Sequence, residues 1–145
     1  MELDPSTGKI DLTRIVAVED CGTMINPQVV EGQMRGGIAQ GIGMALLESL
    51  EYDANGQLNN ASFMDFLVPN ALTLPDIECA HLSTPSPLTE GGIKGCGEAA
   101  MLSIHCAVGS AVSDALTDYG VLIPLSLPIG PQQVLDLIRS RQGGK

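Results

Sequence analysis

The sequence predicts a single α+β domain over residues 1–145, with helices packed on a small mixed or antiparallel sheet. The chain has 145 residues, of which 44% are hydrophobic, so it is long and apolar enough to bury a core. Apolar residues recur at helical spacing in long segments, whereas β-branched residues with partial alternation mark shorter ones. Neither an internal repeat nor a linker-like stretch divides the sequence.

The first expected strand is Ile10–Val18, preceded by the turn cluster Asp4–Lys9. A turn at this place predicts a hairpin. Its first arm contains only Met1–Leu3, so we expect its partner strand to be missing or to come from another segment. An unpaired strand edge promotes association, and we therefore expect the isolated chain to form dimers or larger species.

A long helix is expected from Pro27 to about Leu50. Asn26 offers its side-chain oxygen as the N-cap, and Pro27 presets φ at the first helical position. Further strands are expected at 58–68, after the turn Asp53–Gly56, and at Ile77–Ser83.

Residues 84–97 form a loop rich in proline and glycine that is longer than an ordinary connector, and such loops are usually functional. A second amphipathic helix follows, with apolar residues at helical spacing from Met101 to about Leu116. A third helix is expected from Pro131 to near Arg141.

The first helix is unusually rich in glycine: Gly32, Gly36, Gly37, Gly41 and Gly43. Each glycine costs about 1 kcal/mol relative to alanine in a helix interior, so about 5 kcal/mol must be offset. Tight packing against another helix is the simpler explanation. Alternatively, Gln33 and Gln40 flank bare backbone on one helix face, an arrangement that suits a flat ligand rich in hydrogen-bonding atoms, such as a pterin.

The net charge, the length of the apolar segments and the first five residues argue against several classes of protein. Seven Lys and Arg against seventeen Asp and Glu give a net charge of −10, which repels nucleic acid. The uncharged run Ala99–Ser113 is too short for a membrane span. Residues 1–5 lack the features of a signal peptide, so we expect a cytoplasmic protein.

The cysteines, at Cys21, Cys79, Cys96 and Cys106, are isolated from one another. We expect reduced thiols, because clustered spacing for iron–sulfur ligation or for a disulfide scaffold is missing. His105 and Cys106 point about 100° apart on a helix and are expected in the core. Cys79 and His81 share a strand face, but two ligands do not make a zinc site. A zinc hydrolase built on His81, His105 and cysteines remains an alternative that metal analysis would reveal.

The segment Lys94-Gly95-Cys96-Gly97-Glu98 places a carboxylate at the start of a helix. An acidic residue at this position is usually a helix cap, and the pattern alone favours that interpretation. The glycines before Glu98 could also let backbone N–H groups line an anion or a cofactor. Because Lys94 is followed by Gly, the segment is not a P-loop.

Several short motifs occur in an order typical of one family: Asp20-Cys21-Gly22, Asn26-Pro27, Gly32-Gln33, Gly36-Gly37, Gln40-Gly41-Ile42-Gly43, Tyr52–Gly56, Phe63–Pro69 and Lys94-Gly95-Cys96-Gly97-Glu98. The chain resembles the C-terminal part of the molybdenum-binding large subunit of the xanthine dehydrogenase, aldehyde oxidase and carbon monoxide dehydrogenase family. The resemblance extends over nearly the whole chain. The fold it implies is a fragment of the molybdenum-cofactor-binding domain of such an enzyme.

The resemblance implies that the assembled enzyme oxidatively hydroxylates an aldehyde, N-heterocycle or related substrate with water as the oxygen source. It makes Glu98 the active-site base and places Gln40 against the pterin. The other residues that it places at the cofactor are Gln33, Gly41, Lys94, Gly95, Cys96 and Gly97. The implied cofactor is molybdenum–molybdopterin, with the cytosine dinucleotide form expected for a bacterial relative.

Subunits of this family are several times longer than 145 residues, so the resemblance implies that this chain cannot complete the site alone. The expected partners are the remaining part of the large subunit and partner subunits that carry iron–sulfur clusters and FAD. The segment Ser103–Cys106 departs from the family pattern, which puts local cofactor contacts there in doubt. The alternative is a non-catalytic homologous fragment that acts as an assembly or interaction module.

Overall fold

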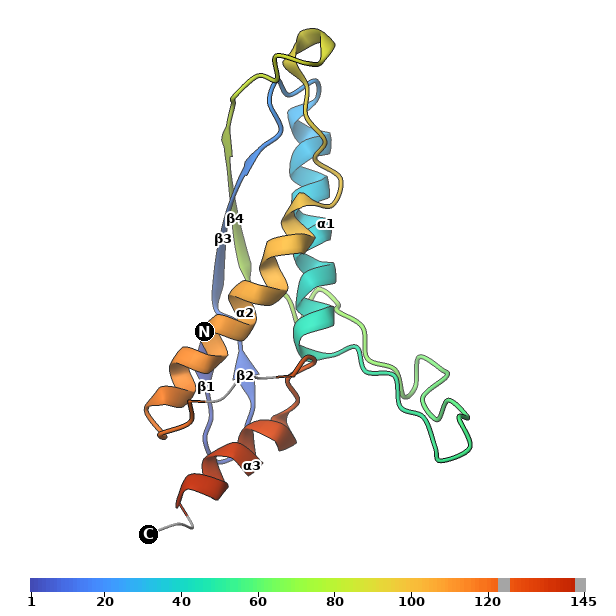
Figure 1. Cartoon of the computed structure of the whole chain (residues 1–145), viewed down its shortest axis with the longest axis vertical. Helices are drawn as coiled ribbons and strands as arrows, with labels where there is room; N and C mark the ends of the chain where they lie inside the picture. Colours follow the sequence, from blue (N-terminus) through green and yellow to red (C-terminus); the bar gives the residue numbers. More distant parts are fainter. Residues whose placement is uncertain (123–125, 143–145) are drawn as a thin grey trace.

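The structure, a computed structural model, describes residues 1–122 and 126–142. Its elements, in chain order, are β1 (Glu2–Leu3), β2 (Ile10–Asp11), β3 (Arg14–Asp20), α1 (Pro27–Leu46), β4 (Asp76–Leu82), the 3-10 helix η1 (Glu90–Gly92), α2 (Ala99–Thr117) and α3 (Pro131–Gln142). The long helix α1 lies beside the β3–β4 ribbon. Helix α2 crosses α1, and α3 lies at the end near β1 and β2 (Figure 1). The α+β class and the three helices are therefore confirmed.

The strands form two separate two-stranded sheets within the described residues, instead of the single sheet that we expected. β3 and β4 pair in parallel over seven residues, from Arg14↔Asp76 to Asp20↔Leu82. Parallel neighbours need a crossover connection, and α1 lies within it. Because the strands are parallel, the segments that follow β3 and β4 leave the sheet at the same end.

The expectation that the first hairpin lacks a partner strand is wrong. β1 pairs with β2 in antiparallel fashion, with Leu3 opposite Ile10. The turn between them is closed by Asp4, which accepts hydrogen bonds from the Ser6 N–H at 2.8 Å and the Thr7 hydroxyl at 2.7 Å. The Ser6 and Thr7 bonds lower the pKa of Asp4 to about 2. The predicted strand is also divided, because β2 ends at Asp11 and β3 begins at Arg14 in the other sheet.

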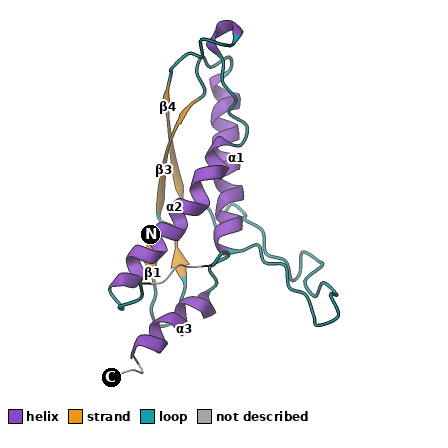
Figure 2. Ribbon diagram, viewed as in Figure 1, coloured by secondary structure: helices purple, strands orange, loops and turns teal. Residues whose placement is uncertain are grey.

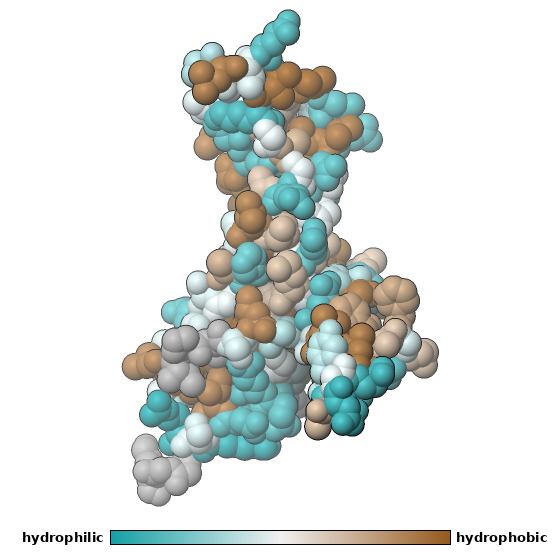
Figure 3. All heavy atoms as spheres, turned by 45° about the vertical axis from the view of Figure 1, so that its right-hand side comes forward, coloured by the Kyte–Doolittle hydropathy of each residue, from teal (hydrophilic) through white to brown (hydrophobic). Residues whose placement is uncertain are grey.

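The predicted strand at 58–68 is also wrong. Residues 47–75 form an arm that projects from the body as loop and turns, shown in teal in Figure 2. Its hairpin turn is present, marked by one bridge between Tyr52 and Leu58. Beyond the bridge, no strand of the described structure lies alongside segment 58–68 to pair with it. Without such a neighbour, β-propensity alone does not make a strand. Phe63 and Met64 are 87% and 91% exposed, and Figure 3 shows such hydrophobic side chains on the arm.

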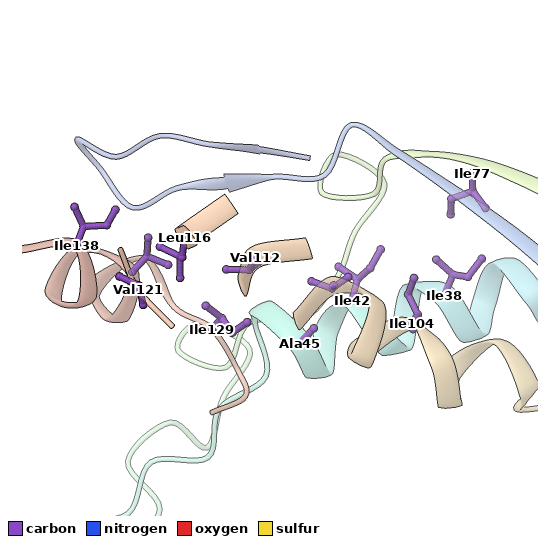
Figure 4. Packing of buried hydrophobic residues seen from close by; sticks show 12 residues of the cluster. Ile38, Ile42, Ala45, Ile77, Ile104, Val112, Leu116, Val121, Ile129 and Ile138 are labelled. Carbon is purple, nitrogen blue, oxygen red and sulfur yellow. The ribbon is translucent and has the colours of Figure 1, made fainter. Parts of the chain in front are cut away.

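The core lies where α1 and α2 cross. Figure 4 shows Ile38 and Ile42 of α1 close to Ile104 of α2, with Ile77 of β4 above them. The core continues along α2 toward α3, which adds Ile138. These buried side chains join the parallel ribbon, both long helices and the C-terminal helix in one cluster.

By length and composition alone, α2 could cross a membrane, because it has 19 residues and a mean hydropathy of 1.4. The expectation that no segment is long enough is therefore wrong for this helix. In the structure, one side of α2 is part of the protein core. Its buried residues there are Ile104, Val108, Val112 and Leu116.

Glycine packing explains part of the unusual composition of α1. A Cβ atom on Gly41 would overlap Cγ2 of Ile104 and lie 3.0 Å from its Cβ atom. At Gly37 it would lie 3.1 Å from the Met101 nitrogen. Gly32 and Gly36 have open space at the same position. The packing explanation is thus confirmed at Gly37 and Gly41, where α2 approaches the α1 backbone, and does not hold at Gly32 and Gly36.

This difference predicts opposite effects of two alanine substitutions. Gly41→Ala should lower the melting temperature, because overpacking against Ile104 costs about 1–3 kcal/mol and outweighs the gain in helix propensity. The control Gly36→Ala adds the same methyl group in open space and should stabilise the chain by about 0.5–1 kcal/mol. Thermal and urea unfolding followed by circular dichroism measure both. Equal effects of the two substitutions would contradict the packing.

Candidate functional site

One carboxylate joins three segments at the end of the parallel ribbon. Asp20 is the last residue of β3, and its Oδ1 accepts the backbone N–H of Gly22 at 2.8 Å and that of Thr84 at 3.1 Å. Its Oδ2 accepts a hydrogen bond from Lys94 Nζ at 3.1 Å. Asp20 therefore fixes the segment after β3, the segment after β4 and the loop that leads to α2.

Backbone contacts complete this junction. The Lys94 N–H donates to the Cys21 carbonyl at 2.9 Å, and the Thr23 N–H donates to the Gly92 carbonyl at 3.1 Å. Gly22 adopts a φ of +67°, and a Cβ atom there would overlap the Gly92 oxygen. Only glycine combines that backbone conformation with so close an approach. The loop therefore has a defined start at Lys94.

The electrostatics of Asp20 follow from these bonds. The Thr84 N–H and side chain, the Gly22 N–H and, to a lesser extent, the Lys94 ammonium favour the ionised carboxylate, whereas burial opposes it. Together they hold the pKa of Asp20 well below its ordinary value of 3.8. The junction therefore depends on a charged Asp20.

From Lys94 the loop runs beside α1 to the first turn of α2 (Figure 1). Gly95 and Gly97 are exposed, and a Cβ atom on either would meet nothing within 4 Å. Cys96, between them, is partly buried, and burial, with the Glu19 and Cys21 charges, raises the pKa of its thiol. The loop therefore offers open backbone on both sides of a thiol that is not activated as a nucleophile.

Glu98 occupies the N-cap position of α2, but its side chain makes no capping hydrogen bond. The capping interaction that the sequence pattern favoured is therefore not formed, and the residue is exposed. Its position is fixed by its neighbours, because Ala100, two residues later, lies against Gly37 of α1. The carboxylate at the helix N-terminus is therefore available to another group.

The two glutamines of α1 lie near the start of α2. Gln33 and Gln40 are one helical turn before and one turn after Gly37, on the face that the first turn of α2 approaches. Both residues are exposed. Helix geometry thus places Gln33 and Gln40 on the α1 face that the residues after Glu98 approach, although Gln40 and Glu98 are 58 positions apart in the chain.

Gly41 and Lys94, also predicted at the cofactor, have other contacts within this chain. The α-carbon of Gly41 faces Ile104, so α2 covers it. The ammonium group of Lys94 pairs with Asp20. Both residues therefore shape the site from within, and their direct contact with a cofactor stays a prediction.

The histidines and cysteines do not assemble into a metal site in the part of the chain that the structure describes. His81 is on β4 and His105 on α2, and no group of three or more potential ligands occurs among these residues. His105 donates from Nδ1 to the Met101 carbonyl at 3.1 Å. Cys106 is exposed, so its expected place in the core is wrong. The structure gives the zinc alternative no support.

The junction at Asp20 was not recognised from the sequence as a functional element. The only local signal was the Asp20-Cys21-Gly22 triplet, in which an aspartate precedes a glycine by two residues, as in an Asx-turn. The Thr84 and Lys94 partners lie 64 and 74 positions further along the chain. A local pattern does not contain contacts over such separations.

Comparison with known proteins decides the family. The sequence model described as the molybdopterin cofactor-binding domain matches residues 1–75. The chain belongs to this family. It is 46% identical over 135 residues to the nicotine 6-hydroxylase large subunit of Paenarthrobacter nicotinovorans, a match that covers 93% of this chain and 16% of that protein. It is 39% identical over 115 residues to the carbon monoxide dehydrogenase large chain of Afipia carboxidovorans, covering 79% and 14%.

A solved structure shows the same fold. The chain superimposes on quinoline 2-oxidoreductase from Pseudomonas putida 86 with a TM-score of 0.92 and 53% identity, covering 96% of this chain and 18% of that one. The resemblance that the motifs indicated is therefore confirmed. The chain spans about one-sixth of the length of the curated relatives that it matches.

The junction predicts a specific pH dependence. A carboxyl whose pKa is lowered by folding stabilises the protein above its ordinary pKa, here 3.8, and this contribution is lost as the pH falls through the lowered value. The melting temperature of Asp20→Asn should therefore lie below that of the wild type by a constant amount above about pH 5, and this difference should shrink below about pH 4. The other acidic groups are the same in both proteins, so their contributions to the difference in melting temperature cancel.

Asp11→Asn is the matched control, because Asp11 forms an exposed ion pair with Lys9 at 2.8 Å, and such pairs contribute little to stability. Its melting temperature should stay close to that of the wild type at every pH. Scanning calorimetry between pH 2 and pH 8 measures all three proteins. A pH-independent difference for Asp20→Asn would contradict the role given to the charged carboxylate.

Proposed function

We propose that the chain forms part of the active site of a molybdenum hydroxylase large subunit, with Glu98 as the base in oxidative hydroxylation by water. The observation that carries this proposal is the uncapped, exposed carboxylate of Glu98 at the N-terminus of α2. A short polar side chain at this position, such as aspartate or serine, ordinarily accepts hydrogen bonds from its own helix. The fold instead leaves this one free beside open backbone and exposed amides.

The residues around Glu98 fit a molybdenum–pterin cofactor. Gln33 and Gln40 are exposed, and an amide can donate to and accept from the heteroatoms at a pterin edge. Gly95 and Gly97 have no neighbouring atoms where a Cβ would stand, so their backbone can approach a flat ring system or the metal ligands closely. When bound, the cofactor supplies the redox centre that accepts the electrons removed from the substrate.

Glu98 would act on protons. With the cofactor and substrate bound, it would serve as the base that takes up the proton released during hydroxylation. The positive end of the α2 helix dipole lies at this position, where an anionic group is favourable. Because neighbouring residues hold the start of α2 against Gly37, the carboxylate keeps its place without a hydrogen bond of its own.

The substrate class we propose is an aromatic N-heterocycle. The 46% identical relative is named for nicotine and the 53% identical structure for quinoline, and both compounds are N-heterocycles. Carbon monoxide dehydrogenase is 39% identical over a shorter segment. This chain contributes the base and part of the cofactor site, whereas the residues that choose a substrate belong to the remaining five-sixths of the relatives' length.

The partners in this proposal are the rest of a large subunit and subunits that carry iron–sulfur clusters and FAD. The cofactor proposed for a bacterial enzyme is the cytosine dinucleotide form. The apolar residues Val16 and Val18 on the outer side of β3 are 57% and 58% exposed, which supports association with such partners. These exposed side chains, rather than an unpaired hairpin strand, support association of the isolated chain.

The base assignment predicts the effect of Glu98→Gln in the assembled enzyme. This substitution keeps the side-chain size and removes the proton acceptor, so turnover should fall by at least about 100-fold while molybdenum and pterin content stay at the wild-type level. Glu90→Gln is the matched control, because Glu90 is an exposed glutamate in the same loop at η1. It should leave turnover unchanged.

Steady-state kinetics and metal analysis on the same preparations decide the outcome. Normal turnover of Glu98→Gln with full molybdenum content would remove Glu98 from the mechanism. A wild-type assembly that binds no molybdenum would instead favour the alternative of a non-catalytic module.

A further inference from the structure

A buried carboxyl without a partner lies next to the Asp20 junction. Glu19 is 7% exposed, and neither of its carboxyl oxygens has a hydrogen-bond partner. It lines a cavity of about 360 Å³ whose other walls include Ala99 and Ala100, the first two residues of α2 after Glu98. An isolated buried carboxylate is strongly destabilising, so a group that donates a hydrogen bond to it is expected.

A second unpartnered polar atom is on the neighbouring strand. His81 of β4 is the direct register partner of Glu19, and its Nδ1 atom is buried without a hydrogen bond. Adjacent strands lie about 4.8 Å apart, so opposed side chains on one face are within reach of each other. Alternate residues of both strands, including these two, are the more buried ones and therefore share the inner face of the ribbon.

The other ionisable groups near Glu19 offer no better partner. Cys79 on β4, Cys96 in the loop and Cys21 after β3 are thiols, and burial raises the pKa of Cys79 and Cys96. On α1, Arg35 is already paired with Glu31 at 2.8 Å and is exposed. Burial raises the pKa of Glu19, and the opposing effect comes from His81.

We propose that the Nδ1–H group of His81 donates a hydrogen bond to the Glu19 carboxylate, and that this pair positions the loop that carries Glu98. The proposal rests on the function proposed for Glu98. An ionised carboxylate has only acceptor atoms, whereas a neutral imidazole donates from one of its ring nitrogens, so the histidine is the donor of this bond. The structure leaves the two side chains unbonded, and one bond between them would partner the His81 Nδ1 atom and one of the two Glu19 oxygens.

The pair is connected to both ends of the loop. Glu19 directly precedes Asp20 and Cys21, whose carboxylate and carbonyl hold the side chain and the backbone of Lys94. Glu19 also lines the same cavity as Ala99 and Ala100, where the loop enters α2. In this proposal Glu19 and His81 are positioning residues that act through the loop.

Nitrogen-15 NMR of the imidazoles in the 145-residue chain tests the pair directly, because the chain has two histidines. His105 serves as the internal reference, since its Nδ1 donates to a carbonyl and must carry a proton. In the wild type, Nδ1 of His81 should also be protonated at pH 7. In Glu19→Leu, His81 should lose the Nδ1 proton while His105 keeps it. Glu19→Gln, which retains an accepting oxygen, should keep it on both.

Hydrogen exchange of the backbone amides tests the positioning role. In Glu19→Leu, the Lys94 amide that bonds to Cys21 should exchange at least about 10-fold faster, and Glu19→Gln should restore the wild-type rate. A wild-type His81 without a proton on Nδ1 would overturn the proposal even if the leucine variant does not fold. Unchanged Lys94 exchange in a folded Glu19→Leu would overturn the positioning role. Neither result depends on turnover of Glu98→Gln, so failure of the pair and failure of the proposed function are distinguishable.

Discussion

The geometry of the site depends on the Asp20 carboxylate at the end of the parallel ribbon. Because β3 and β4 run in the same direction, the chain leaves both strands at one end, and Asp20 binds the backbone of both departing segments. Its second oxygen holds Lys94, so the long loop before α2 begins at a fixed point. Without this carboxylate, three segments with little regular structure would meet with unpaired backbone groups and one unpaired lysine.

The other end of the loop is fixed by packing rather than by charge. Gly37 and Gly41 bring the backbone of α1 close to α2, and the core along Ile38 and Ile42 holds the two helices together. Glu98 therefore lies between two fixed points. A helix that lacks a side-chain cap loses about 0.5–2 kcal/mol of stability, and a local rule broken inside an otherwise consistent fold is typical of a functional site.

The sequence predicted correctly those elements whose formation depends on residues adjacent in the chain. Asn26 caps α1 as expected, accepting from the backbone N–H groups of Gln28 and Val29, and α3 begins at Pro131. The helix nevertheless ends at Leu46, where the Glu48 N–H bonds to the Gly43 carbonyl, one residue further back than in a regular α-helix. The strand at 58–68 failed for the opposite reason: strand formation needs a neighbour, and the sequence pattern does not show which segments will be neighbours.

The candidate site shows the same contrast between features given by local motifs and features that need strands to pair. The motif order named Glu98 and the α1 glutamines as candidates, which stays a prediction, whereas the Asp20 junction and the facing of Glu19 and His81 arise only when β3 and β4 pair. The most direct test is a crystal structure of the assembled large subunit with its cofactor bound. The account predicts that the Glu98 carboxylate faces the molybdenum centre, with the Gly95–Gly97 backbone against the cofactor and Asp20 still bound to Lys94. A Glu98 side chain folded back onto the N–H groups of α2, with the cofactor away from this loop, would contradict it.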